Sequence, residues 1–257
     1  MKYCVLMIAL AAGTLQAQSL VADSKPQVQP AVPVQTEKPK PVVTTEMRGD
    51  IAMARKMYRE AIDYYSEVEP RTAVIWNKIG IGYHHLMELN LAKKAYEKAI
   101  KTNPKYSEAI NNLGAVYYAQ RSYRRATGQY RKALKISPES ASILSNLGTA
   151  WFARKKYDKA ADCYQRALAL DPEIFEHRST TGVLLQERSV EERAKFHFYL
   201  SKTYAKAGAA ERALLYMRKA LEEGFKDRKR FVDDPEFAAL QELPEFQELM
   251  ALQPRAL

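Results

Sequence analysis

The amino-acid sequence predicts an all-α protein built from stacked, repeated units, and three observations carry this prediction. Residues 111–138, NNLGAVYYAQRSYRRATGQYRKALKISP, recur in almost the same form 34 residues later, and such a period is typical of stacked supersecondary units. Small residues recur at fixed places in each period, where neighbouring helices would come close. A proline closes each period, because it cannot continue the preceding helix. With 257 residues, 47% of them hydrophobic, the chain can bury a core.

Five columns align when the chain is compared with itself at an offset of 34 residues. Glycine inside a helix costs about 1 kcal/mol relative to alanine, so its recurrence predicts that another helix crosses too closely for a side chain. The alanines serve the same approach, and the tyrosines are expected to fill the space between units. The columns are Gly80, Gly114 and Gly148; Ala92, Ala126 and Ala160; Tyr96, Tyr130 and Tyr164; Ala99, Ala133 and Ala167; and Pro104, Pro138 and Pro172.

These columns resemble the tetratricopeptide repeat. The resemblance implies a right-handed superhelical solenoid of stacked antiparallel helix pairs. The matching units are 73–106, 107–140 and 141–174, with looser copies at about 42–72 and 194–227. In the last copy Ser201 stands where the glycine would be, and Met217 stands in the tyrosine column.

The segments outside the repeats have other compositions. Residues 1–18 have the pattern of a secretory signal peptide, so we expect an exported protein, periplasmic or secreted. Cys4 lies inside the apolar run, which argues against a lipid anchor, and cleavage would leave Cys163 as the one cysteine. Residues 19–45 hold five prolines and are expected to form a linker. We therefore predict a solenoid over 46–227, interrupted by an insertion at 175–193, and capping helices over 228–257.

No motif in the sequence predicts catalysis, a metal or a cofactor. His84 and His85 are adjacent on an expected helix and point about 100° apart, so they cannot chelate one ion together. The Gly80-Ile81-Gly82 stretch lacks the third glycine and the preceding strand of a dinucleotide site. We expect a protein that is not an enzyme.

Charge is unevenly distributed. A run without any acid contains the residues that we call the basic face: Arg121, Arg124, Arg125, Arg131, Lys132 and Lys135. It could bind an anionic polymer or a membrane surface, or it could be a solvated outer face. The predicted export argues against nucleic acid. The acidic segment 231–254 could also meet the basic face of the same molecule or of another copy, so self-association is a further alternative.

A second stripe runs along the first helix of each unit. In proteins similar to this one, that stripe lines a concave groove. Its amides, hydroxyls and aromatic rings suit an extended peptide or helix of another protein, with Tyr118, Phe152 and Phe198 as anchors. Alternatively, the rings pack against the next unit, or the chain's own tail fills the groove. We call this set the first-helix stripe: Asn77, Ile81, His84, Asn111, Ala115, Tyr118, Ser145, Thr149, Phe152, Phe198 and Lys202. The resemblance implies a scaffold in envelope assembly or secretion, and the partner's identity stays open.

Overall fold

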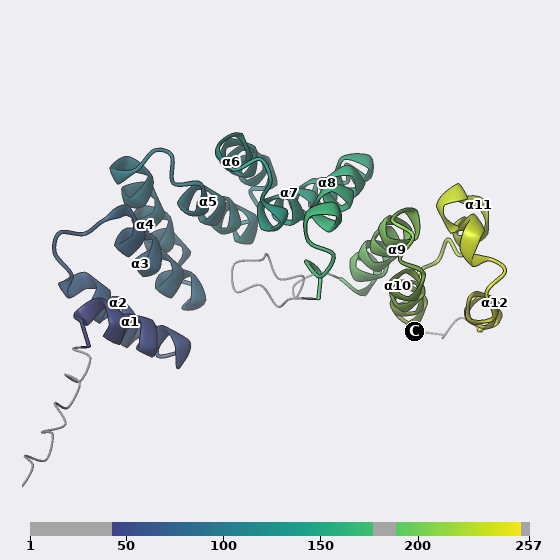
Figure 1. Ribbon diagram of the computed structural model, residues 1–257, viewed down its shortest axis with the longest axis horizontal. Coiled ribbons are helices and arrows are strands. Elements are labelled where there is room, and N and C mark those ends of the chain that lie inside the picture. The colour runs from purple at the N-terminus through teal and green to yellow at the C-terminus, as the bar shows by residue number, and fades with distance from the viewer. Residues whose placement is uncertain (1–42, 177–188, 253–257) are drawn as a thin grey trace, which may run out of the picture. The chain divides into compact units, whose positions relative to one another are not determined.

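The computed structural model describes residues 43–176 and 189–252, which belong to one compact unit beginning at Val43. The predicted signal peptide, nearly all of the linker and most of the predicted insertion lie outside the described residues. Within the described ranges the regular structure is helical and contains no strand (Figure 1). The predicted all-helical class is therefore confirmed for that part of the chain.

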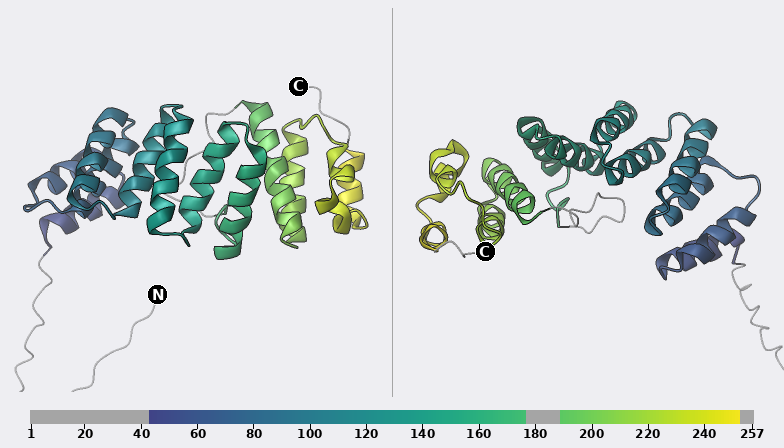
Figure 2. Two further views of the ribbon diagram at one scale, coloured as in Figure 1. Left: turned by 90° about the horizontal axis from the view of Figure 1, so that it is seen from above. Right: turned by 180° about the vertical axis from the view of Figure 1, so that it is seen from behind.

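Ten helices form five consecutive antiparallel pairs in the described ranges (Figures 1 and 2). The pairs are α1 (Thr45–Ala54) with α2 (Tyr58–Glu67), α3 (Ala73–His85) with α4 (Leu89–Thr102), α5 (Ser107–Ala119) with α6 (Tyr123–Ile136), α7 (Ala141–Ala153) with α8 (Tyr157–Leu170), and α9 (Val190–Lys206) with α10 (Ala210–Glu222). The second helix of each pair also packs against the first helix of the next. Each unit therefore shares its core with its neighbours.

Local sequence sets where these helices begin and end. The side chains of Thr44, Thr72 and Ser140 accept hydrogen bonds from the first turns of α1, α3 and α7, which are ordinary N-caps. At the other end, Asn103 and Asp171 precede prolines and adopt extended or near-extended backbone, so α4 and α8 stop there. Polar caps thus start these first helices, and the Asx-Pro pairs end these second ones.

The recurrent glycines face the recurrent tyrosines within the same helix pair. A Cβ atom on Gly80 would lie 2.5 Å from Cε1 of Tyr96, and one on Gly114 would lie 2.6 Å from Cε1 of Tyr130. The atoms that exclude a side chain therefore belong to a tyrosine ring of the same pair, which corrects the prediction of a close helix crossing. Tyr96 and Tyr130 are almost completely buried and also contact residues of the next unit.

The last pair solves the same packing problem with different residues. Ser201 fills the glycine position, and its hydroxyl donates a 2.7 Å hydrogen bond to the backbone oxygen of Ala213. Met217, which is fully buried, replaces the tyrosine ring sixteen residues later. A flexible thioether side chain fits irregular space better than a rigid ring. Loss of the glycine is thus accompanied by loss of the ring.

A C-terminal segment covers the last helix pair. It comprises α11 (Arg230–Asp233), the 3-10 helix η1 (Pro235–Leu240) and α12 (Pro244–Ala251), and both of the latter begin with proline. Helix η1 packs against α9, and α12 packs against α10. Phe231 and Phe237 are fully buried there. The segment therefore shields apolar surface at this end of the stack.

The glycine–tyrosine contact predicts opposite effects at two glycines. Gly114→Ala should destabilise the fold by about 1–3 kcal/mol, because its Cβ would overlap the ring of Tyr130. A Cβ on Gly128, in α6, would have no atom of the described residues within 4 Å, so Gly128→Ala should stabilise by up to about 1 kcal/mol through helix propensity. Urea denaturation followed by circular dichroism measures both. Equal effects at the two positions would contradict this packing.

Candidate functional site

The first-helix stripe lies on α3, α5, α7 and α9, and its residues fall into three columns counted from the glycine of each unit. The first column lies three residues before the glycine: Asn77, Asn111, Ser145 and Phe198. The second follows it directly: Ile81, Ala115, Thr149 and Lys202. The third lies four residues after it: His84, Tyr118 and Phe152. Burial and bonding differ between the columns and between the units.

Amide side chains in the first column form a buried ladder between units. Asn112 Nδ2 donates to Asn77 Oδ1 at 3.0 Å, and Asn146 Nδ2 donates to Asn111 Oδ1 at 3.0 Å. At the preceding junction, Lys78 Nζ bonds Glu46 Oε1 at 2.8 Å in the same manner. Asn77 and Asn111 are about 95% buried. These predicted groove amides therefore connect neighbouring units of the fold.

The second column meets the hydroxyl groups of the buried tyrosines. Asp50, at the equivalent place in α1, accepts a 2.8 Å hydrogen bond from the hydroxyl of Tyr65. Thr149 accepts one from Tyr164 at 3.3 Å. Ala115 offers no acceptor, and the buried hydroxyl of Tyr130 has no hydrogen-bond partner among the described residues. Burial, with a smaller effect of Tyr118, raises the pKa of Tyr130 well above its usual range. The middle unit thus contains an unsatisfied polar group.

The three predicted anchors occupy different environments. Tyr118 is half-buried, with its ring 5.1 Å from that of Tyr123. Phe152 is 4% exposed and packs edge-on against Phe196. Phe198 is fully buried and stacks on Phe225, with ring centroids 4.4 Å apart. Phe152 and Phe198 are therefore core residues of this structure, and Tyr118 retains an accessible part.

Lys202 and His84 complete the stripe. Lys202 Nζ lies 2.8 Å from Asp234 Oδ2 and 3.1 Å from Glu236 Oε2. The chain's own C-terminal segment therefore contacts the stripe of the last unit, as one of the alternatives proposed. Burial, and second the neighbouring His85, lower the pKa of His84 to about 4. His84 is consequently neutral at neutral pH.

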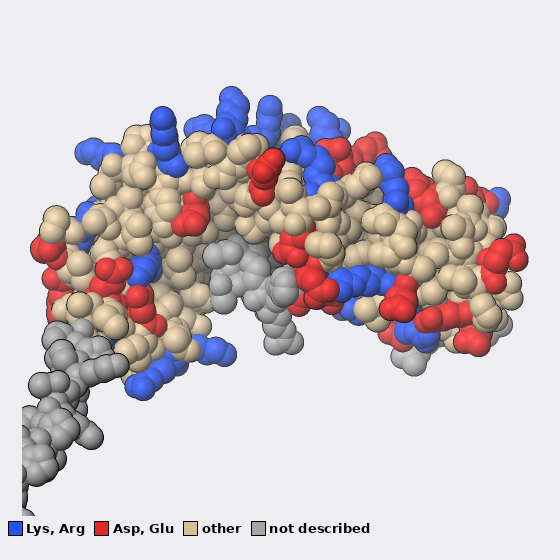
Figure 3. Space-filling view, in the orientation of Figure 1, with Lys and Arg blue, Asp and Glu red and all other residues tan. Residues whose placement is uncertain are grey.

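The six residues of the basic face are all exposed and lie on α6 or the turn before it. Figure 3 shows Lys and Arg side chains along the upper edge of the view, over α4, α6 and α8. Within the described residues, none of the six lies within 4.0 Å of an acidic group. The charge of this face is thus not neutralised by the described part of the chain.

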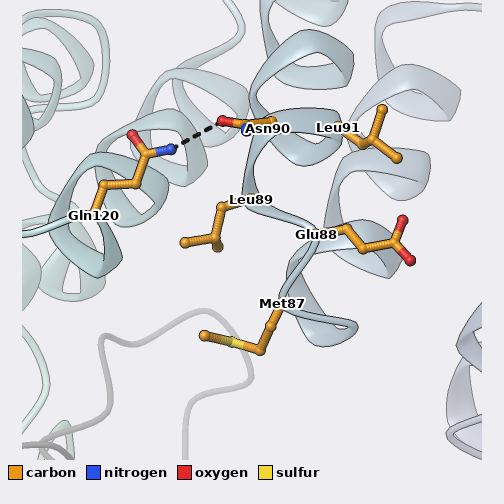
Figure 4. Close-up of a pocket in the computed structure, with 6 residues that line it drawn as sticks. All are labelled: Met87, Glu88, Leu89, Asn90, Leu91 and Gln120. Carbon is orange, nitrogen blue, oxygen red and sulfur yellow. Dashed lines mark hydrogen bonds between the residues drawn. The ribbon is translucent and has the colours of Figure 1, made fainter.

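A cavity of about 440 Å³ lies away from the stripe, at the turn between α3 and α4 (Figure 4). Its lining combines Met87, Leu89 and Leu91 with Glu88, Asn90 and Gln120. Gln120 donates a 3.4 Å hydrogen bond to Asn90 and so connects two successive units. This cavity was not predicted from the sequence. Its signal is an exposed methionine at a turn where the next two units have Arg121 and Lys155.

Chemistry-bearing clusters are absent from the described ranges. No group of three or more His, Cys, Asp or Glu side chains there could hold a metal ion. None of the helices described is both long enough and apolar enough to cross a bilayer. Cys163 is buried, and burial raises the pKa of its thiol to about 11.

Helix pairs joined by one repeated packing rule define a helical repeat protein. More particularly, the chain is a tetratricopeptide repeat protein, because three models of that repeat match residues 73–106, 95–127 and 141–174. The first and last of these ranges have the same bounds as two units predicted from the sequence.

Solved structures share this fold at low sequence identity. One described as the functional characterization of Pseudomonas aeruginosa PilF is 20% identical, with a TM-score of 0.53, covering 80% of this chain and 95% of that chain. A crystal structure of MamA is 20% identical, with a TM-score of 0.48, covering 68% and 93% respectively. No curated protein was found to match the sequence. These likenesses concern the fold alone.

The tyrosine hydroxyls allow a matched pair of substitutions. Tyr65→Phe should cost about 1 kcal/mol, because it removes the hydrogen bond to Asp50. Tyr130→Phe should be neutral or stabilising by up to about 1 kcal/mol, because it removes a buried group that no described residue satisfies. Thermal unfolding of the two variants measures the difference. A larger loss at Tyr130 would show that its hydroxyl is satisfied in solution.

Proposed function

We propose that this protein is a non-enzymatic scaffold that binds an extended peptide or a helix of another protein along the first-helix stripe. The observation that carries the proposal is the hydroxyl of Tyr130 beside Ala115 and Tyr118, which no described residue satisfies. A buried polar group without a partner costs roughly 1–3 kcal/mol, and a ligand that supplies an amide or carboxylate would recover it.

The neighbouring units narrow where such a ligand would bind. The amide ladder already uses Asn77 and Asn111, and the C-terminal segment already meets Lys202. The half-buried members of the stripe outside these contacts are Ile81, His84, Tyr118 and Ser145. A ligand over the second to fourth units would meet an apolar chain, a neutral imidazole, a phenol and a hydroxyl. That mixture suits a partly apolar peptide with main-chain hydrogen bonds.

We further propose that the protein is exported and serves envelope assembly or secretion. The support is the signal-peptide pattern of residues 1–18 together with the resemblance to exported repeat proteins. Amino-terminal sequencing of the protein from its host tests this: a mature chain that begins at or near residue 19 supports export, and an intact Met1 contradicts it.

Peptide display tests binding along the stripe. A library of random displayed peptides, selected on the wild-type chain, should yield sequences whose Kd rises at least about tenfold on Tyr118→Ala, as expected for a central aromatic contact. Tyr64→Ala is the matched control, because Tyr64 is also a half-buried tyrosine but lies on the second helix α2. Its Kd should change by less than about twofold.

Circular dichroism of both variants separates lost binding from lost folding. If selection enriches no sequence, or if Tyr64→Ala weakens binding as much as Tyr118→Ala does, binding along the stripe is wrong.

A further inference from the structure

The positive charge of this protein is concentrated in its central helices. Residues 89–170 contain 16 Lys and Arg and only 5 Asp and Glu, a formal charge of +11, whereas the whole chain carries +10. The rest of the chain is therefore almost neutral. Like charges at this density repel one another in the folded state, and the repulsion is relieved when anions bind.

The cations recur at the same place in successive units. Lys98, Lys132 and Arg166 are separated by 34 residues each and lie on α4, α6 and α8, as do Lys101 and Lys135 on the first two of these helices. All five are exposed. We call them the second-helix cation columns. They point away from the Ala and Tyr columns, which occupy the buried side of the same helices.

Acids in the described part of the chain leave these columns unpaired. Among the Lys and Arg of residues 89–170, the ion pair found within the described ranges joins Lys93 to Glu97 at 3.8 Å. By contrast, cations near the C-terminus are paired: Lys202, Arg218 and Arg230 each contact an acid. The described residues can thus satisfy their cations internally, yet they do not do so on α6.

We infer that the second-helix cation columns bind an acidic segment of a partner polypeptide, one rich in Asp and Glu. Carboxylates spaced along a flexible chain can reach cations that are distributed over three helices. This surface is separate from the first-helix stripe, so it adds a second contact to the proposed scaffold and does not depend on it.

Two other anionic partners fit less well. Single-stranded nucleic acid is usually held by bases stacked on exposed rings, but the rings of Trp76 and Trp151 are covered by Lys98 and by Arg154 and Lys159. Membrane-surface helices insert large apolar side chains between their cations. On α4, α6 and α8 the exposed large apolar residues, Leu91, Ile136 and Leu170, lie at helix ends.

The test measures binding of fluorescent poly-L-glutamate to the full chain by anisotropy. Wild type should bind and lose at least about tenfold in affinity between roughly 50 and 200 mM salt, because the contact is ionic. The triple variant Lys101→Glu, Lys132→Glu, Arg166→Glu changes one exposed cation on each helix and disrupts no ion pair found in the described ranges. It should bind at least about tenfold more weakly.

A charge-matched control gives the result its meaning. The triple variant Arg48→Glu, Lys206→Glu, Lys226→Glu makes the same change in net charge at exposed positions elsewhere, and its affinity should fall less than about threefold. Equal losses in the two triples would show that net charge alone attracts the polymer and would overturn the proposal. Tighter binding to heparin, oligothymidylate or phosphatidylglycerol vesicles than to poly-L-glutamate, at matched charge, would overturn the assignment to a polypeptide.

Discussion

The contact between a glycine on each first helix and a tyrosine ring on the following helix sets the spacing of four of the five helix pairs in the described ranges. The rings of Tyr65, Tyr96, Tyr130 and Tyr164 are at most 1% exposed, and each lies where a Cβ on the glycine would be. A large ring and an absent side chain make one shape, so neither can change alone. The last pair shows the corollary, since Ser201 is matched by Met217.

Contacts between successive units use a different chemistry from contacts within them. The amide ladder and the Lys78–Glu46 pair place hydrogen bonds between neighbouring first helices, and buried hydrogen bonds of this kind fix a register more strictly than apolar contacts do. At Gly82 the second helix of the previous unit also comes close, because a Cβ there would lie 2.6 Å from Ile62. The face on which a ligand is proposed to bind is therefore partly structural.

The period of 34 residues made the columns of the helix pairs predictable, because each column repeats one residue type. The ladder was hidden for a geometric reason: Asn77 bonds Asn112 and Asn111 bonds Asn146, so its partners are 35 residues apart and fall in different columns. The turns were hidden for another. A residue with positive φ stands seven places after each glycine position, but only Gly208 among them is the residue type that signals it.

The two faces of the helix pairs differ in how their polar groups are satisfied. First helices carry amides and hydroxyls that bond to the next unit, so few groups are left for a ligand on that face. Second helices carry long cations that the buried Ala and Tyr columns force outward, and these cations have almost no acids near them in the described ranges. A solvated surface needs charges of both signs interspersed, and α6 contains none of one sign. Because Lys132 is remote in sequence from every ladder residue and exposed, the chemistry of one face can change without that of the other.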